Sequence, residues 1–224
     1  MACLRPLPRE VGRRGGFELK LSTLSPNALA MKLVIPIAAL VIAAPALAAG
    51  WKPAERTETY EISGATGIAL YRSIGERGPE VGTKGAIAYT TFALKWSRDY
   101  VPEGGGCRLA SARPHLTVIY RLPKPAGKLP AATQQLWEQF ISGIAAHERV
   151  HGEYIVDMTK ATEAATVGLF AADDPECKKV RAMVAERAIA ANEEQRRRGR
   201  DFDRAEMSDG GNVHRLILAL VNGR

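Results

Sequence analysis

Between residues 130 and 172 the apolar positions recur at steps of three and four, which is the period of an α-helix with one buried face. The members of this stripe are Trp137, Phe140, Ile144, His147, His151, Tyr154 or Ile155, and Met158. Pro130 suits a first helical turn, and the next proline is Pro175. The pattern therefore predicts one long helix with both histidines on its buried side.

Upstream of this helix the apolar period changes from 3.6 to 2, which indicates β-strands. We expect a short pair of strands at residues 57–63 and 67–72, and longer strands at 86–98 and 108–122. Segments rich in glycine and proline at 75–85 and 102–106 predict turns or loops.

Downstream, a second helix is expected from Pro175 to about Arg198, with Gly199 as its stop, and the apolar tail 213–221 is expected to pack back on the body. Strands followed by helices predict an α+β fold, in which an N-terminal antiparallel sheet precedes two long helices and the first helix carries the two histidines.

Residues 31–48 read MKLVIPIAALVIAAPALA, in which a lysine precedes an apolar run that ends in small residues. This pattern predicts a secretory signal peptide that is cleaved after Ala48 or Ala49. We interpret residues 1–30, which show no sustained periodicity, as lying upstream of a true start at Met31. A long n-region and an uncleaved membrane anchor are the alternatives, but the apolar run is shorter than the roughly 20 residues that a membrane span needs.

Removal of residues 1–48 leaves a single expected domain, residues 49–224, in the periplasm or outside the cell and without a stable membrane anchor. Six basic and two acidic residues are lost with the leader, so the net charge falls from +7 to +3. The remaining arginine cluster at 196–200 is typical of a solvated helix end, and no nucleic-acid partner is expected. Cys107 and Cys177 remain as an even pair, which predicts a disulfide in an oxidising compartment, with two buried thiols as the alternative.

The long helix contains the string His147-Glu148-x-x-His151. Histidines four residues apart point to one side of a helix, where both can bind a single zinc ion, and the intervening Glu is then placed to act as a general base. Each histidine taken singly is more often a packed or solvated residue than a ligand. A glutamate on an apolar helix face, however, is costly to bury unless a cation or another partner compensates it.

A catalytic zinc ion needs a third protein ligand, and the sequence offers several candidates. We favour Asp209 narrowly over His214, and Asp203 and Asp157 are further alternatives. His115 lies in an expected strand and is a weaker candidate. Tyr154 or an arginine could stabilise a developing oxyanion, but nothing in the sequence selects one.

Several features together resemble the bacterial family of predicted secreted zinc-dependent proteases. They are the signal peptide, the strand with Trp96, the Leu122-Pro123 pair, the Trp137-x-x-Phe140 stretch, the HExxH string, the cysteine pair and Phe202-Asp203. The resemblance covers roughly residues 60–211 and implies an exported zinc-dependent protease. This chain departs from the family's C-terminal pattern because residues 202–210 contain no histidine.

These patterns lead to two hypotheses. The first is an exported zinc metallopeptidase, in which His147, His151 and a third ligand bind Zn²⁺ and Glu148 is the general base for hydrolysis of a protein or peptide substrate. The second is a non-catalytic exported domain that retains the same helix and binds a metal or a partner.

Overall fold

The computed structural model describes residues 50–81 and 84–223. The expectations for residues 1–49, which include the signal peptide, its cleavage site and the start at Met31, lie outside the described residues. The chain order is β1 (Ala54–Ile62), α1 (Gly67–Arg77), β2 (Glu80–Val81), β3 (Lys84–Gly85), β4 (Tyr89–Glu103), β5 (Gly106–Pro125), α2 (Ala131–Thr166), β6 (Phe170–Ala171), α3 (Lys178–Met207) and α4 (Asn212–Asn222).

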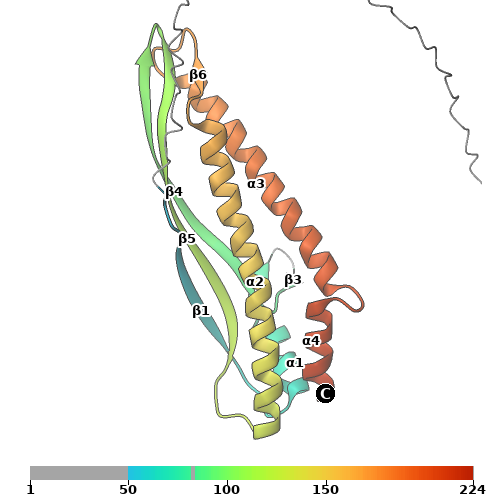
Figure 1. The fold of residues 1–224 in the computed structure, drawn as a ribbon. Coiled ribbons are helices and arrows are strands. Elements are labelled where there is room, and N and C mark those ends of the chain that lie inside the picture. Colours follow the sequence, from blue (N-terminus) through green and yellow to red (C-terminus); the bar gives the residue numbers. More distant parts are fainter. Residues whose placement is uncertain (1–49, 82–83, 224) are drawn as a thin grey trace, which may run out of the picture. The chain divides into compact units, whose positions relative to one another are not determined.

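The α+β class that the sequence predicts is confirmed, with the main sheet formed before the two long helices (Figure 1). β5 is the central strand of this sheet. It pairs antiparallel with β4 and β6, but it pairs parallel with β1. The sheet is therefore mixed and not purely antiparallel. A parallel pair needs a long connection, and α1, the small β2–β3 pair and β4 supply it between β1 and β5.

The β4–β5 hairpin pairs the longest strands from Tyr89 opposite Arg121 to Glu103 opposite Gly106, with a shift of register between Asp99 and Tyr100. Its turn consists of Gly104 and Gly105, whose φ angles are 57° and 81°. Two consecutive positive φ angles are the requirement of a two-residue hairpin turn that matches the twist of the strands. Glycine adopts them without steric cost, which explains the glycine-rich segment that the sequence marked as a turn.

The expected strand at residues 67–72 was wrong, because this segment forms the first part of α1. Thr66 caps the helix by accepting a hydrogen bond from the backbone N–H of Ala69 at 3.3 Å. Leu70 and Ile74, one helical turn apart, are buried against Leu220 of α4 and other core residues. The helical spacing of these two apolar residues outweighs the short alternation that suggested a strand.

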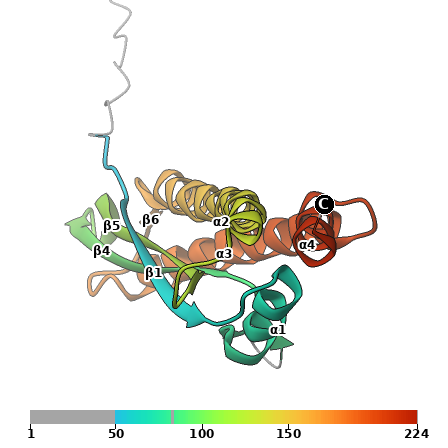
Figure 2. The same cartoon turned by 90° about the horizontal axis from the view of Figure 1, so that it is seen from below.

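The helices form a second layer on one face of the sheet. α2 runs along the sheet, and α3 returns antiparallel beside it, as Figure 1 shows. Alternate residues of β5, such as Leu116, Val118 and Tyr120, pack against Ile155 and Met158 of α2. Near one end of this layer α1 and α4 lie together, which Figure 2 shows from below.

α3 continues through Gly199 to Met207, so the expected helix stop at Gly199 was wrong. Gly199 is buried, and a Cβ at this position would lie 3.5 Å from Nδ1 of His151. This is an ordinary van der Waals distance, and α3 continues through Gly199 with its backbone close to the His151 ring instead of ending there. As a consequence, residues 200–207 lie on α3 beside the histidines.

The predicted disulfide is confirmed: Cys107 of β5 is bonded to Cys177, the residue that precedes α3. The two sulfur atoms belong to a buried apolar cluster that also contains Leu109, Val180 and Val184. The bond joins the sheet to the beginning of α3, at the opposite end of that helix from Asp203. In the described residues, no helix has the length and apolarity to span a bilayer.

Candidate metal centre

His147 and His151 lie one turn apart on α2, and both imidazoles face α3. Their side chains are mostly buried, with 9% and 16% of their surface exposed. The two Nε2 atoms are 3.2 Å apart. The helical spacing predicted this common orientation, because residues i and i+4 lie on the same face of a helix.

Asp203 of α3 completes a group of three ligand atoms. Its Oδ1 lies 2.8 Å from Nε2 of His151 and 3.2 Å from Nε2 of His147. Among the residues with described positions, His147, His151 and Asp203 form the one group of three or more metal-binding side chains whose ligand atoms converge. This group could hold a metal ion.

The structure brings Asp203, one of the alternatives that the sequence offered, to the histidines, whereas Asp209, the residue that the sequence favoured, lies outside the group. Asp209 is exposed in the turn between α3 and α4. His214 of α4 accepts a hydrogen bond from the backbone N–H of Gly210 at Nδ1, 3.1 Å away. Asp157 points to Arg198, with 3.1 Å between Oδ2 and Nη1. None of these three belongs to the convergent group.

The charges of the group are coupled. Burial alone would raise the pKa of the Asp203 carboxyl, but hydrogen bonds from His147 and His151 outweigh it and hold that pKa well below its usual range. For His151, burial alone would lower the pKa of the imidazole, yet the hydrogen bond to Asp203 raises it above the usual value. The lowered pKa of Asp203 and the raised pKa of His151 both favour the charged forms of these two side chains.

Glu148 is adjacent to the group but points to the sheet. Its residue surface is 6% exposed, and Oγ1 of Thr90 on β4 lies 2.5 Å from its Oε2 and 3.1 Å from its backbone carbonyl oxygen. Burial raises the pKa of the Glu148 carboxyl, and the hydrogen bond from Thr90 and the charges of His151 and His147 offset only part of that increase. A buried carboxyl group with a raised pKa beside a metal-binding group is a candidate for proton transfer.

An aromatic residue that the sequence did not assign to the site lies against both imidazoles. The Phe202 ring stacks on His147 with 4.7 Å between centroids and an interplanar angle of 19°. It meets His151 edge to face at 5.5 Å and Tyr154 at 6.1 Å. The guanidinium of Arg198 lies 4.1 Å above the Tyr154 ring. These contacts restrict the rotation of the histidine rings.

The spacing of residues on α3 could have revealed this face. Gly199, Phe202, Asp203 and Glu206 recur at steps of three and four and so lie on one side of a helix. All four contact or approach the histidines of α2. This pattern was missed because the predicted helix ended at Gly199 and so left Phe202, Asp203 and Glu206 outside it.

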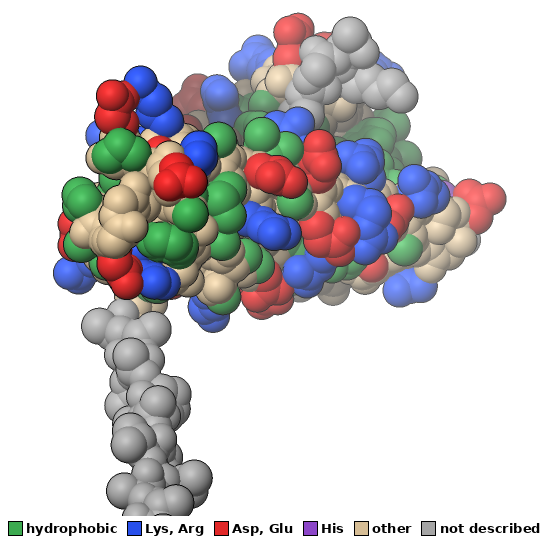
Figure 3. Space-filling model, turned by 90° about the horizontal axis from the view of Figure 1, so that it is seen from above, with side chains coloured by type: hydrophobic (Ala, Val, Ile, Leu, Met, Phe, Trp, Pro, Cys, Tyr) green, Lys and Arg blue, Asp and Glu red, His purple; other side chains and the backbone are tan. Residues whose placement is uncertain are grey.

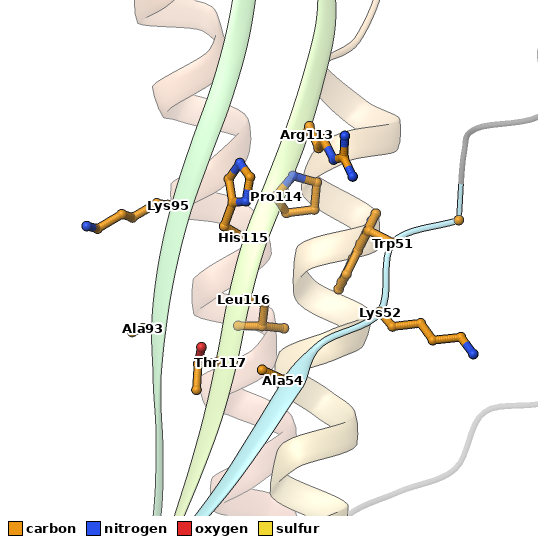
Figure 4. A pocket seen from close by; sticks show the side chains of 11 residues that line it. Trp51, Lys52, Ala54, Ala93, Lys95, Arg113, Pro114, His115, Leu116 and Thr117 are labelled. Atoms are coloured by element: carbon orange, nitrogen blue, oxygen red, sulfur yellow. The ribbon is translucent and has the colours of Figure 1, made fainter.

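The larger of the two described cavities lies away from this group. It has a volume of about 630 Å³ and is lined by residues at the beginning of β1 and by neighbouring parts of β4 and β5 (Figure 4). Lys52, Lys95, Arg113 and His115 contribute its basic side chains. His115 bonds to Oγ of Ser97, with 2.9 Å to its Nε2, so it is a strand residue at this cavity and not a member of the metal-binding group.

The face of the molecule that Figure 3 shows carries acidic and basic side chains close together. Two arginines of the cluster on α3 contact carboxylates: Arg197 contacts Glu194 and Asp201 on the same helix, and Arg198 contacts Asp157 on α2. These pairs distribute the positive charge of α3 among neighbouring carboxylates.

Fold and site together define an α+β domain with a candidate metal centre between its two long helices. Residues 57–211 match DUF922, a bacterial protein family of unknown function, and the chain belongs to this family. Comparisons with curated proteins and with solved structures found no match. The matched range includes His147, Glu148, His151, Asp203 and both disulfide cysteines. The family match therefore covers the whole site but assigns it no activity.

Proposed function

We propose that this protein is an exported zinc metallopeptidase. The observation that carries the proposal is the convergence of His147, His151 and Asp203 on one point, with Glu148 next to the first histidine on the same helix. Three protein ligands with one open position are the arrangement of catalytic zinc sites, whereas structural sites use four protein ligands.

The three ligand atoms lie close enough together to share one zinc ion. Zinc bonds to histidine nitrogen and carboxylate oxygen are about 2.0–2.2 Å long, so tetrahedral ligand atoms lie about 3.3–3.6 Å from one another. The three distances here are 2.8, 3.2 and 3.2 Å, each shorter than that range, so the side chains would move slightly apart to hold the ion. Two imidazoles and a carboxylate are also a ligand set of the type that binds zinc in hydrolases.

When bound, zinc would supply a Lewis acid that polarises the substrate carbonyl and makes water easier to deprotonate. Glu148 then takes a proton from water at its carboxylate and passes it to the nitrogen of the leaving amine. Thr90 holds the Glu148 carboxylate in position while it changes its protonation state. His147 and His151 are held by Phe202, so little rearrangement accompanies catalysis.

Export is supported by two independent features. The sequence of residues 31–48 has the pattern of a cleaved signal peptide, and Cys107 and Cys177 form a disulfide, as is usual in an oxidising compartment. The proposed location is therefore the periplasm or the exterior. Intact mass of the exported protein tests the proposal, with an N-terminus at Ala49 or Gly50 as the expected result.

One observation favours the alternative, a non-catalytic exported domain that binds metal or a partner through the same helix. Glu148 is almost fully buried, and its carboxylate is hydrogen-bonded to Thr90 on the sheet side of α2. A peptidase needs a substrate carbonyl within reach of this carboxylate. Metal binding does not distinguish the two functions, because both include it. Only a measurement of peptide hydrolysis does.

The deciding experiment compares the zinc-loaded protein with its Glu148→Gln variant on a fluorescently labelled, unfolded protein substrate. A peptidase should lose about 10² to 10⁴ in rate with the variant and keep its zinc, because the general base is removed and the ligands remain. Glu153→Gln, an exposed position on the same helix, is the matched control and should keep its activity. Absence of hydrolysis by the zinc-loaded wild-type protein would favour the non-catalytic domain.

A further inference from the structure

His147 has a buried nitrogen whose role the three ligands do not explain. Its Nε2 faces His151 and Asp203, whereas its Nδ1 has no hydrogen-bond partner within the described part of the chain. A neutral imidazole carries one N–H and one lone pair. If Nε2 is to bind a metal, the hydrogen must be on Nδ1, and a buried N–H without an acceptor is unfavourable.

The residue that can satisfy this nitrogen is Glu206. It follows Asp203 by three residues on α3, so the two carboxylates lie on the same face of the helix. Oδ1 of Asp203 lies 3.2 Å from Nε2 of His147, and Oε2 of Glu206 lies 3.7 Å from its Nδ1. Each nitrogen of one imidazole therefore faces a different carboxylate of the same helix.

We propose that Glu206 is a positioning residue of the metal centre, which accepts a hydrogen bond from Nδ1–H of His147 and thereby holds the tautomer whose Nε2 lone pair is free for the metal. The proposal rests on the metal binding in the proposed function. It assigns Glu206 no contact with the metal or with a substrate. Carboxylates that orient a ligating histidine in this way are common around zinc and typically change metal affinity by 10- to 100-fold.

The 3.7 Å separation is longer than a hydrogen bond by roughly 0.7 Å, and the Glu206 side chain is the part that moves. Phe202 stacks on the His147 ring and restricts its rotation. The Glu206 side chain is 21% exposed and flexible, so a small change in its torsion angles brings Oε2 to the nitrogen.

The test compares the wild-type protein with Glu206→Ala and Glu206→Gln, using zinc ion and a chelator in competition. Glu206→Ala should bind zinc 10 to 100 times more weakly, because the acceptor is lost. Glu206→Gln should remain close to wild type, because its amide oxygen still accepts the hydrogen bond. Glu193→Ala, at an exposed position about three turns earlier on α3, is the control and should leave the affinity unchanged.

A second measurement does not depend on metal. In the metal-free protein Nε2 of His147 faces Asp203 and Nδ1 faces Glu206, and nitrogen-15 NMR reports how the hydrogen is divided between the two nitrogens. The share on Nδ1 should decrease in Glu206→Ala and persist in Glu206→Gln. Glu206→Met, which has similar length and no acceptor, should behave as Glu206→Ala does, and it replaces that variant if Glu206→Ala does not fold.

The outcomes separate the two proposals. Failure of the wild-type protein to bind zinc would refute the proposed function, while the NMR result still judges Glu206. Normal zinc affinity and an unchanged tautomer in both Glu206→Ala and Glu206→Met would overturn the positioning role alone. Equal loss of affinity in Glu206→Ala and Glu206→Gln would also overturn it, because a requirement for the charge indicates direct ligation.

Discussion

His151 and Asp203 are 52 residues apart in the sequence, and 2.8 Å separates Nε2 of the histidine from Oδ1 of the aspartate. Their contact joins α2 to α3 one helical turn after Gly199, whose backbone lies close to the His151 ring. A metal ion here would add a link between the two helices to the contacts of Asn192 with Met158 and of Arg198 with Asp157. Four predictions follow from this arrangement and its surroundings.

Replacement of Asp203 should distinguish the ligand that the tertiary structure supplies from the one that the sequence favoured. Asp203→Ala should weaken zinc binding by more than about 100-fold, because it removes a proposed ligand atom and not merely a supporting contact. Asp209→Ala should leave the affinity unchanged, since Asp209 is exposed and outside the group. Chelator competition measures both, and a larger effect of Asp209→Ala would contradict the proposed ligand set.

The Asp203–His151 pair should make the stability of the metal-free protein depend on pH. Folding lowers the pKa of Asp203. Its contribution to the free energy of unfolding is therefore present above the unfolded-state pKa of about 4 and is lost as the pH falls through the folded-state pKa. Folding raises the pKa of His151. Its contribution to the free energy of unfolding is therefore present below about pH 6.5 and is lost as the pH rises through the folded-state pKa. Both contributions are complete between about pH 4 and 6.5.

Asp203→Asn tests this dependence. The difference in free energy of unfolding between wild type and Asp203→Asn should be largest between about pH 4 and 6.5 and should narrow at higher pH. Urea denaturation in the presence of a chelator, at several pH values, provides the measurement. A difference that grows steadily from pH 6 to pH 9 would show that the pair does not titrate as described.

Loss of the Cys107–Cys177 disulfide should destabilise the fold without changing the metal centre. The cysteines are separated by 70 residues, and a loop of this size corresponds to about 4 kcal/mol of unfolding free energy in the chain-entropy model. The double variant Cys107→Ser and Cys177→Ser should unfold at lower urea concentration by an amount equivalent to about 2–4 kcal/mol.

Zinc affinity of the folded double variant should match that of the wild-type protein, because Cys177 and Asp203 lie at opposite ends of α3. Reduction of the wild-type protein is the chemical control and should reproduce the shift. Equal stability of oxidised and reduced protein would contradict the assigned contribution of the bond.

Gly199 should tolerate a methyl group but not a longer side chain. A Cβ at this position would make ordinary van der Waals contact with His151, at 3.5 Å from Nδ1 and 3.7 Å from Cε1. Gly199→Ala should therefore retain zinc binding and gain up to about 1 kcal/mol of stability from its better helix propensity. Gly199→Leu should push α3 away from α2, separate Asp203 from the histidines and weaken zinc binding. Thermal unfolding and chelator competition on the two variants check the prediction, and equal zinc affinity for both would argue against close helix contact as the role of this glycine.

Local periodicity determined the elements that carry the histidines. The spacing of Trp137, Phe140 and Ile144 extends through His147 and His151, and a helix places side chains four residues apart on one face whatever its surroundings. A strand likewise places alternate side chains on opposite faces, so the alternation from His115 to Tyr120 correctly predicted β5. The disulfide followed from the number of cysteines and the expected compartment, since only one pair remained.

The third ligand and the surroundings of Glu148 depended on tertiary structure, because they come from elements distant in the chain. A glycine at position 199 is compatible with the end of a helix or with a close contact between two helices. The packing of α3 on α2 decides for the second. That selection extends the helix and brings Asp203, instead of Asp209, to His147 and His151. Thr90 reaches Glu148 only because β4 lies beside α2. The sequence by itself therefore determined which residues share a helix face, whereas the packing of that face against other elements decided which atoms meet.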